Sequence, residues 1–421
     1  MNRRIFCSGI AAGFAARPSV ARAALLASEG FRNLREDLAA ISTEEAYWNR
    51  VRREFCVSPG LVHLNTGTLG STPRRVLDAV SALMYELEGD PAGNVFGPLG
   101  SRMESVRAKA AEFLGAELDE VALTENTTAG MNAVAQGVAR WLREGDEILS
   151  TDHEHPGGSV CWEYLERQLG VKVVRIPMPA PVRDPDQVLQ LVCERLTPRT
   201  RIVSLSHVET ITGLRMPLAE IAAVTRPRQI LLVCDGAQAP GMLKVDVKAL
   251  GVDTYASSSH KWMLAPKGSG LLYVRREVQD RVQPMVLSAG YQSYTAASGT
   301  RNVPQILGHG LAMDFHHAIG RDRVEKRCCA LAAELRGRLE RIGALKLLSP
   351  THDQLASGIV TFGLRTGKNQ AIYERLLAEH NIVVKVVPKP EYNALRFSTH
   401  VYNCEDDLDR TAALLERFLG S

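Results

Sequence analysis

The sequence of 421 residues lacks long hydrophobic runs, internal repeats and low-complexity tracts. After the N-terminal residues, no stretch of about 18 or more apolar residues occurs, which excludes a membrane-spanning helix. The rest of the composition, with 45% hydrophobic and 23% charged residues, is that of an ordinary globular protein. The length accommodates one large domain and a smaller one.

A strong charge bias is also missing. The formal net charge is +3, and residues 1–23 contribute four arginines and no acidic residue. The remainder therefore carries 3 − 4 = −1. A nearly neutral body argues against nucleic acid as the main partner, because nucleic-acid binding depends on clustered positive charge.

The eight cysteines show neither a CxxC pair nor the spacing of metal ligands. Several lie in apolar runs, as Cys234 does in "ILLVCD", and are predicted to be small core residues. An oxidising compartment would permit disulfides, but the spacing does not pair them. The cysteines are Cys7, Cys56, Cys161, Cys193, Cys234, Cys328, Cys329 and Cys404.

The N-terminus has the arrangement of an export signal. Arg3 and Arg4 precede Phe6, a weakly apolar stretch follows, and "ARAA" offers an Ala-x-Ala cleavage site that ends at Ala23. The paired arginines and the weakly apolar core favour the twin-arginine (Tat) route over Sec. Residues 1–23 are therefore predicted to be a Tat-type signal peptide that the Tat translocase recognises, which gives a periplasmic location. A disordered basic tail on a cytoplasmic protein is the alternative.

The central part of the chain alternates between short apolar segments and segments with helical spacing. Repeated strand–helix units with continuous apolar strands, such as "QILLVCD", are typical of a mostly parallel sheet covered by helices. Before this part, helices are predicted at 36–56, 74–87 and 101–114. Strands are then predicted at 120–124, 146–151, 171–177, 201–208, 229–235, 254–259 and 268–274, and helices at 129–142, 159–169, 184–196 and 217–225.

The pattern changes after about residue 305, where it becomes helical. Later strands are predicted at 358–362, 382–387 and 394–399. The predicted fold class is therefore α/β, a large domain with a mostly parallel sheet plus a smaller α+β C-terminal domain. The predicted divisions are an N-terminal segment that packs with the small domain at 24–70, the large ligand-binding domain at 71–305 and the small domain at 306–421.

Polar residues follow the predicted strands, and ligands of open α/β sheets bind beyond the carboxyl ends of the strands. Thr127 and Thr128, in "TENTTAG", open a helix whose amides and dipole favour an anion, although threonine at a helix start is also a common cap. Asp235 ends the most apolar strand, where a buried carboxylate needs a partner. That partner is either a helix start or the protonated ring nitrogen of a cofactor, which Gln238 would also reach.

His155, in "DHEHPGG", has two interpretations. With His153 and Glu154 it forms a candidate metal site, although no helix spacing supplies a further ligand. Alternatively, its flat imidazole stacks on an aromatic ligand.

Lys261, in "SSSHKWMLAPKGSG", lies among Ser258, His260 and small residues. A lysine there is a phosphate-binding point charge, a Schiff-base amine or an ordinary solvated lysine. The first two interpretations agree if one ligand carries a phosphate, an aromatic ring and an aldehyde. That ligand is pyridoxal 5′-phosphate (PLP).

Over most of residues 60–410, the chain resembles the class V aminotransferases, which have the fold type I of PLP enzymes. "DGAQAPG" and "SSSHKWMLAPKGSGLLYV" carry the resemblance, together with five strand ends in matching order. It implies that Lys261 holds the cofactor, Asp235 pairs with its ring nitrogen and His155 stacks on its face. It further implies a phosphate site at Thr127, Thr128, Ser258 and His260, and positions near the ring hydroxyl for Gln238 and Thr210.

Two more positions match the family. Thr300, in "ASGTRN", resembles the residue that reaches the phosphate of the neighbouring subunit, which implies a homodimer with shared active sites. Arg396, in "ALRFSTHVYN", matches the arginine that holds the substrate α-carboxylate, a bidentate task that suits a guanidinium.

The cofactor residues do not select one reaction. Transamination, racemisation and elimination all begin with removal of the Cα proton, which Lys261 can move once it is freed. Cysteine desulfurases of this family place a nucleophilic cysteine shortly before the carboxylate-binding arginine. The segment "HNIVVKVVPKPEYNALR" has none, so desulfuration is not expected.

Two segments, "SHVETITGLRMPLAEI" and "LRFSTHVYNCEDDLD", resemble the isopenicillin N epimerase-like branch, which handles amino groups of peptide-like substrates. This implies aminotransferase-type chemistry at the α-carbon of an amino acid or a peptide-linked amino acid. Together with the Tat signal, it implies periplasmic modification of the N-terminal glutamate of a pyoverdine siderophore. A cytoplasmic aminotransferase, epimerase or lyase, and a non-catalytic PLP-binding protein, are the alternatives.

Overall fold

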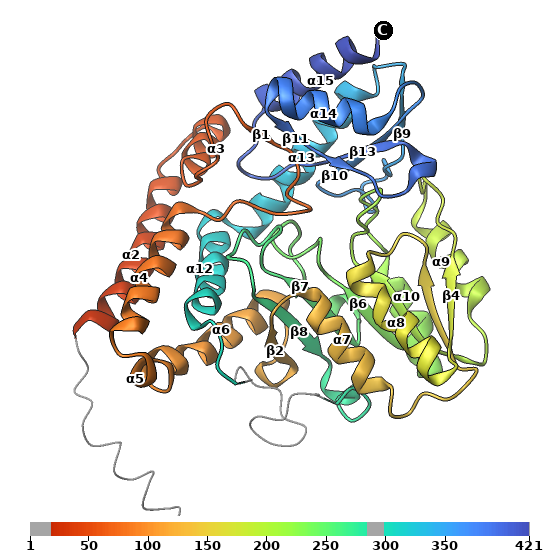
Figure 1. Cartoon of the computed structure of the whole chain (residues 1–421), viewed down its shortest axis with the longest axis horizontal. Helices are drawn as coiled ribbons and strands as arrows, with labels where there is room; N and C mark the ends of the chain where they lie inside the picture. Colours follow the sequence, from red (N-terminus) through yellow and green to blue (C-terminus); the bar gives the residue numbers. More distant parts are fainter. Residues whose placement is uncertain (1–17, 284–298, 421) are drawn as a thin grey trace, which may run out of the picture.

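The computed structural model describes residues 18–283 and 299–420, with side chains from residue 29 (Figure 1). Arg3, Arg4 and Phe6 of the predicted export signal lie outside the described residues. The predicted cleavage point at Ala23 falls within the first described helix, α2 (Pro18–Ala39). Among the described residues, no helix combines the length and the apolarity needed to cross a bilayer.

A seven-stranded sheet forms the centre of the large domain, with the strand order β2-β8-β7-β6-β5-β3-β4. The neighbours from β7 to β4 are parallel, and β8 runs antiparallel to both β7 and β2. The mostly parallel sheet was predicted from the sequence. The strands are β2 (Val121–Thr124), β3 (Glu147–Thr151), β4 (Lys172–Ile176), β5 (Thr200–Ser206), β6 (Leu231–Asp235), β7 (Thr254–Ser258) and β8 (Gly270–Val274).

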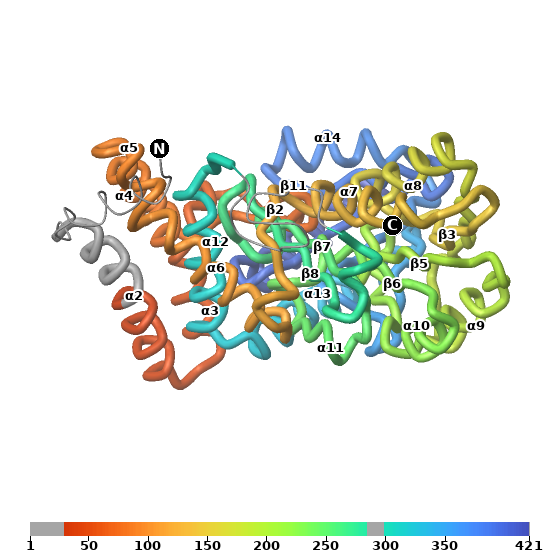
Figure 2. The backbone as a smooth tube through the Cα atoms, turned by 90° about the horizontal axis from the view of Figure 1, so that it is seen from below, coloured from red at the N-terminus to blue at the C-terminus, as the bar shows by residue number. Residues whose placement is uncertain are grey.

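Helices cover both faces of this sheet (Figure 2). On β6, alternate residues serve two cores: Leu231 and Val233 pack in one apolar cluster, and Leu232 and Cys234 pack in another. Cys234 is a buried free thiol, in its predicted core position. One face is covered by α7 (Thr127–Val138) and α8 (Pro156–Leu169), and the other by α9 (Pro185–Arg195), α10 (Leu218–Thr225) and α11 (Val247–Leu250).

A four-stranded antiparallel sheet with the order β12-β13-β10-β9 builds the C-terminal part. Its strands are β9 (Leu345–Leu347), β10 (Ile359–Leu364), β12 (Lys385–Val386) and β13 (Ala394–Ser398). An apolar cluster lies between this sheet and its helices. These helices are α13 (Arg321–Leu339), α14 (Asn369–His380) and α15 (Glu405–Leu419).

The single strand predicted at 382–387 is in fact two short strands. β11 (Ile382–Val383) pairs in parallel with β1 (Val62–His63), whereas β12 pairs with β13. The prediction was wrong because the segment changes its hydrogen-bonding partner at Val384. A continuous apolar run does not show where such a change occurs.

The helix predicted at 36–56 is also two helices, α2 and α3 (Glu44–Arg52). Helix α2 ends at Ala39, and Thr43 caps the start of α3, because its hydroxyl accepts the Ala46 N–H at 3.3 Å. The helices that follow are α4 (Arg74–Gly89), α5 (Pro91–Val95) and α6 (Pro98–Leu114), and α12 (Val303–Ile319) follows the large sheet. Short 3₁₀ turns are η1 (Leu118–Glu120), η2 (Arg226–Arg228), η3 (Arg276–Val278) and η4 (Pro390–Tyr392).

The N-terminal segment divides its contacts between the two parts of the molecule. Helix α2 packs against α4 and α12, which lie beside the large sheet. Strand β1 instead pairs with β11 near the small sheet. The turn after β1, residues 65–70, therefore runs between the two parts. The predicted domain boundaries themselves stay predictions.

Candidate active site

The carboxyl ends of three neighbouring strands meet at one edge of the large sheet. Ser206 at the end of β5 stands opposite Asp235 at the end of β6, and Asp235 stands opposite Ala256 on β7. The turn that carries Lys261 follows β7 directly. The parallel register therefore brings the predicted strand-end residues to one place.

The start of α7 lies against the end of β7. Asn126 caps this helix, because its side chain accepts the Ala129 N–H at 2.9 Å. The Thr127 N–H donates to Ser258 Oγ at 2.9 Å, and the two hydroxyls are 2.7 Å apart. Since Asn126 performs the capping, the cap interpretation of Thr127 is wrong. The helix start remains suited to an anion.

Thr128 lies where the N-termini of α7 and α8 approach each other. A Cβ added at Gly157 would lie 2.7 Å from Thr128 Oγ1 and 3.0 Å from His155 Nδ1. His155 caps α8 by accepting the Gly157 N–H at 3.0 Å. Partial burial lowers the pKa of His155, and the Lys261 charge lowers it further, so the accessible imidazole is neutral. A neutral ring in this position can stack on a flat ligand.

Asp235 is 6% exposed, and only one of its two carboxylate oxygens has a hydrogen bond from the described residues. The Ala237 N–H donates to Oδ1 at 2.8 Å, whereas Oδ2 has no hydrogen bond from the described residues. A Cβ at Gly158 would lie 2.3 Å from Oδ2, so the glycine lets α8 approach this oxygen. Burial raises the pKa of Asp235, against the Ala237 N–H and the positive charge of Lys261. No described side chain forms the expected ion pair with it, which leaves Oδ2 available to a cationic ring nitrogen.

Lys261 lies in a turn that backbone contacts hold in place. Its carbonyl accepts the Leu264 N–H at 3.1 Å, and the neighbouring His260 carbonyl accepts the Gly70 N–H at 2.8 Å. Burial lowers the pKa of Lys261 to about 8. An ordinary solvated lysine would keep its usual pKa, so that interpretation is not supported. With this pKa, roughly a tenth of the Lys261 amine is neutral at pH 7, a far larger share than for an ordinary lysine.

His260 has a pKa that burial lowers to about 4, helped by the charges of Lys261 and Lys267. The ring is therefore neutral, and it makes no side-chain hydrogen bond with the described residues. It follows Ser258 by two positions at the end of β7. Its role at the phosphate stays a prediction.

Arg396 brings a cation from the small sheet to this site. It is 3% exposed, and its Nη1 donates to the carbonyl oxygen of Thr210 at 3.0 Å and to its hydroxyl at 2.5 Å. Its Nη2 donates to Asn65 Oδ1 and Thr68 Oγ1, both at 3.2 Å. Nε is buried without a partner, and burial lowers the pKa to about 10. A buried guanidinium without a carboxylate is ready to bind one.

Gln238 is 3% exposed and joins the two parts of the site. Its side-chain amide donates to the carbonyl of Gly67 at 2.9 Å and to Thr210 Oγ1 at 3.3 Å, and its oxygen accepts the Trp262 indole N–H at 2.7 Å. The resemblance implied that Gln238 and Thr210 both lie near the ring hydroxyl, and in the structure their side chains are in contact. Their contact with a ring hydroxyl stays a prediction.

The family model described as aminotransferase class-V matches residues 64–411. The chain belongs to the class-V aminotransferase family. Isopenicillin N epimerase of Amycolatopsis lactamdurans is 33% identical over 391 residues, which cover 88% of this chain and 98% of the relative. A cysteine desulfurase of Cronobacter sakazakii is 31% identical over 348 residues, which cover 75% and 82%.

A solved structure of a C-DES variant, with glycine covalently linked to its PLP cofactor, matches with a TM-score of 0.78 and 26% identity. The match covers 87% of this chain and 98% of that chain. The predictions of fold type I and of the epimerase-like branch of the class-V family are therefore confirmed.

The residues present fit PLP, the cofactor predicted from the sequence and supported by the family match. The start of α7 suits its phosphate, and the unpaired Oδ2 of Asp235 suits a protonated ring nitrogen. The accessible ring of His155 suits the face of the cofactor, and the half-buried amine of Lys261 suits its aldehyde. The helix start, the carboxylate, the imidazole and the amine belong to separate elements. One aromatic phosphate with an aldehyde, such as PLP, is suited to contact all four.

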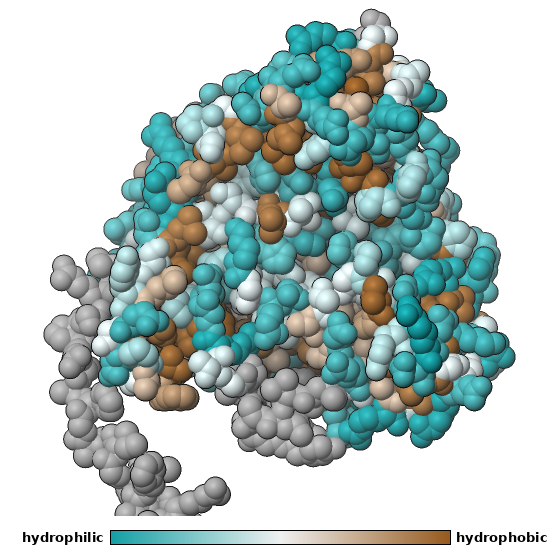
Figure 3. Space-filling view, viewed as in Figure 1, coloured by the Kyte–Doolittle hydropathy of each residue, from teal (hydrophilic) through white to brown (hydrophobic). Residues whose placement is uncertain are grey.

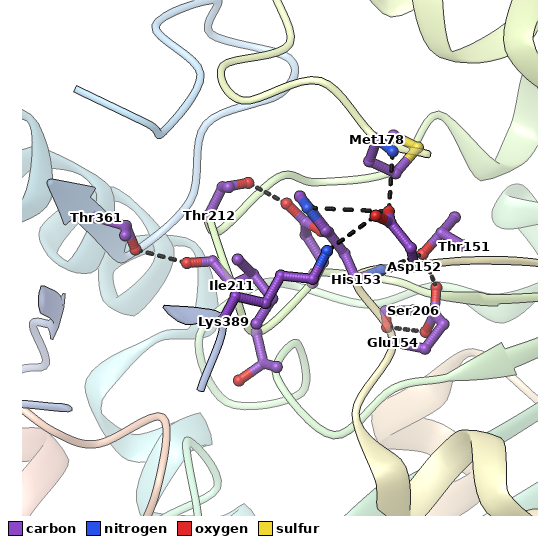
Figure 4. A network of polar contacts seen from close by, with 12 residues as sticks. Thr151, Asp152, His153, Glu154, Met178, Ser206, Ile211, Thr212, Thr361 and Lys389 are labelled. Atoms are coloured by element: carbon purple, nitrogen blue, oxygen red, sulfur yellow. Dashed lines mark hydrogen bonds and ion pairs between the residues drawn. The ribbon is translucent and has the colours of Figure 1, made fainter. Parts of the chain in front are cut away.

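His153 does not accompany His155. It is 1% exposed, with Nδ1 2.5 Å from Glu209 Oε2 and Nε2 2.8 Å from the Tyr392 hydroxyl. Figure 4 shows His153 next to Asp152, on the side that faces Lys389. Because the two histidines bind different partners, the metal interpretation of this class-V chain is not supported. Among the described residues, no cluster of three or more metal-ligating side chains occurs.

The sequence did not indicate which residues accept hydrogen bonds from Arg396 Nη2 and hold its side chain in place. Asn65 and Thr68 come from the turn after β1, and a Cβ at Gly67 would lie 3.0 Å from Arg396 Nη2. In the sequence, Asn65 and Thr68 belong to the turn-rich segment "NTGTLG", which looks like an ordinary surface loop. Only contacts between distant segments show that it lines the site.

Thr300 is exposed and makes no side-chain hydrogen bond with the described residues. The next residue, Arg301, donates to the carbonyl of Leu123 at 2.7 Å, which ties this segment to β2. Within one chain, Thr300 is therefore not joined to the residues above. Its predicted contact with the phosphate of a neighbouring subunit stays a prediction.

Proposed function

We propose that the protein is a PLP-dependent enzyme that acts at the α-carbon of an amino acid or a peptide-linked amino acid. One observation carries this: the partnerless Nε of buried Arg396 lies in the same site as the Lys261 amine and the half-satisfied Asp235. An α-amino acid supplies the carboxylate that Arg396 lacks. The family membership supports the cofactor.

When bound, PLP withdraws electrons from the substrate and makes its Cα–H acidic. The residues of the chain provide the rest. Asp235 would hold positive charge at the ring nitrogen, and Arg396 would orient the α-carboxylate through Nε, its N–H without a partner. With a pKa of about 8, Lys261 can accept and return a proton near neutral pH.

We further propose proton-transfer chemistry of the aminotransferase type, with epimerisation or elimination as the alternative. The relatives include both an isopenicillin N epimerase and cysteine desulfurases. Desulfuration is disfavoured because residues 380–396, from His380 to Arg396, contain no cysteine. Cys404 follows Arg396 and has a raised pKa, mainly because of burial, which makes it a poor nucleophile.

The experiment is exchange of the Cα proton. The PLP-loaded enzyme is incubated with single amino acids in heavy water, and deuterium in the recovered amino acid is measured by mass spectrometry. Wild-type enzyme is expected to label its substrate, and Lys261→Ala is expected to lose labelling by about a hundredfold or more. Lys267→Ala is the matched control, because Lys267 lies in the same loop and contacts the Gly70 carbonyl at 3.3 Å.

Borohydride reduction followed by peptide mapping should attach the cofactor to Lys261. Attachment to Lys267, or equal exchange in wild type and Lys261→Ala, would overturn the proposal. Ketone products detected in the same incubations distinguish transamination from epimerisation, which yields only the mirror-image amino acid.

For the biological role, we propose export by the Tat route and periplasmic modification of the N-terminal glutamate of a pyoverdine siderophore. The support is the arrangement of Arg3, Arg4 and Phe6 before a weakly apolar stretch. Cell fractionation of the wild type and of Arg3→Lys with Arg4→Lys tests export, and the double variant is expected to stay in the cytoplasm with cofactor bound. Equal localisation of both forms would favour the cytoplasmic alternative.

A further inference from the structure

Two cationic side chains stand opposite each other in the four-stranded sheet. In the antiparallel pair β12–β13, Lys385 and Arg396 are direct cross-strand partners. Directly opposed residues of an antiparallel pair project from the same face of the sheet. Because the Arg396 guanidinium reaches Thr210 in the large domain, Lys385 projects toward the same site.

Neither cation has a carboxylate partner among residues 29–283 and 299–420. Lys385 is partly buried, and its ammonium makes no hydrogen bond or ion pair there. Lys389, on the same segment, donates instead to Asp152 at 2.8 Å, as Figure 4 shows. Like charges directly opposite each other destabilise a sheet. The Lys385–Arg396 pair therefore has a cost that bound anions would remove.

The electrostatics of His155 locate Lys385 near the cofactor site. Burial is the main cause that lowers the pKa of His155, and the charge of Lys261 is the next. Arg396 and Lys385 lower it further. The Lys385 charge thus reaches the imidazole that is predicted to stack on the cofactor.

We propose that Lys385 binds a second anionic group of the substrate, beside the α-carboxylate that Arg396 holds. The proposal rests on the proposed function, which assigns the α-carboxylate to Arg396. Arg396 has one N–H without a partner, Nε, and it holds both oxygens of one carboxylate when Nη2 exchanges its bond to Asn65 or Thr68 for the ligand. The opposed ammonium is then left for another anion. The substrate class is an α-amino acid with a further carboxylate on its side chain or on an attached peptide.

The test compares ligands that differ in one charge. PLP-loaded wild type, Lys385→Met and Lys385→Arg are titrated calorimetrically with glutarate and with its monoamide, which has the same shape and one carboxylate. This readout requires no turnover. Wild type is expected to bind glutarate about tenfold or more tightly than the monoamide. Lys385→Met should remove this preference by weakening glutarate alone, and Lys385→Arg should keep it.

Lys368→Met is the matched control, because it removes the same charge from an exposed position next to α14. It is expected to retain the wild-type preference. Equal binding of the two ligands by wild type would overturn the proposal. So would equal weakening of both in Lys385→Met, because this would mean that both cations hold one carboxylate. If Cα exchange still depends on Lys261 in that case, only the Lys385 proposal fails and the proposed function stands.

Discussion

The pKa of the Glu154 carboxyl group is set by its burial and by its neighbours. Its carboxylate accepts hydrogen bonds from Thr151 Oγ1 at 2.8 Å and from the Ser206 hydroxyl. Burial raises its pKa to about 7, and the nearby charge of Asp235 contributes in the same direction. The sequence placed Glu154 in a candidate metal site, but the structure gives it these two hydroxyl partners instead.

The raised pKa predicts a pH dependence of stability. Between about pH 4.5 and pH 7 the folded state keeps a proton on Glu154 that the unfolded state has lost. The contribution of Glu154 to the free energy of unfolding therefore falls as the pH rises through this range. Relative to wild type, Glu154→Gln should gain about 1–2 kcal/mol between pH 5 and pH 8, after allowance for partial exposure.

Urea denaturation of both proteins without cofactor, at several pH values, measures this difference. A difference that stays constant from pH 5 to pH 8 would contradict the raised pKa. Thr151→Val is a useful companion, because it removes one donor to the carboxylate and should raise the pKa of Glu154 further.

At the scale of elements, the start of α8 must approach the end of β6 closely. Gly158 makes this possible, because a Cβ there would meet Asp235 Oδ2 at 2.3 Å. Helix α8 also carries His155 as its cap. The distance between the start of α8 and the end of β6 thus sets the space between Asp235 and the His155 ring, which is predicted to stack on the cofactor.

Gly158→Ala is therefore expected to displace Asp235 or α8 and to weaken PLP binding by about tenfold or more, since a misplaced contact costs on the order of 1–3 kcal/mol. Gly337→Ala is the control, because Gly337 lies in the helix α13 with no atom within 4 Å of an added Cβ. That change should stabilise the protein by about 0.5–1 kcal/mol. Fluorescence titration with PLP and thermal unfolding measure both effects, and unchanged cofactor affinity in Gly158→Ala would show that the space is not tight.

At the scale of the whole molecule, exposed large apolar side chains lie on α4 and directly after α5. Tyr85 and Phe96 are 84% and 85% exposed, and Leu77 and Met84 are exposed beside them. Figure 3 shows hydrophobic side chains on the side of the molecule where these helices lie. Such a patch is unusual on a monomer and is typical of an interface, which agrees with the predicted homodimer.

Sedimentation of the wild type is accordingly expected to give a dimer. Tyr85→Asp with Phe96→Asp should shift it toward the monomer, because burying two carboxylates at an interface is costly. Tyr164→Asp is the control, since Tyr164 is 60% exposed on α8, away from this patch. A monomeric wild type, or a double variant that stays dimeric, would contradict this interface.

Local patterns were sufficient for the elements of the large sheet. Continuous apolar strands such as β6 have few alternatives to burial between two layers of helices. The helix predicted at 36–56 and the strand predicted at 382–387 were wrong because each contains a break. A cap at Thr43 and a change of partner at Val384 decide these breaks, and neither alters the apolar pattern.

The sequence by itself determined the residues at the ends of the parallel strands, Asp235, Ser258 and Lys261 among them. They belong to short segments whose order along the chain sets their place at one edge of the sheet. The family resemblance had already named Arg396 as a site residue, but only the tertiary structure decided which distant groups lie around it. Arg396 and Lys385 arrive from another sheet and Asn65 from an N-terminal turn, and His153 turns away to Glu209. The physical reason is that long-range packing brings these side chains together, and no local periodicity records which segments will meet.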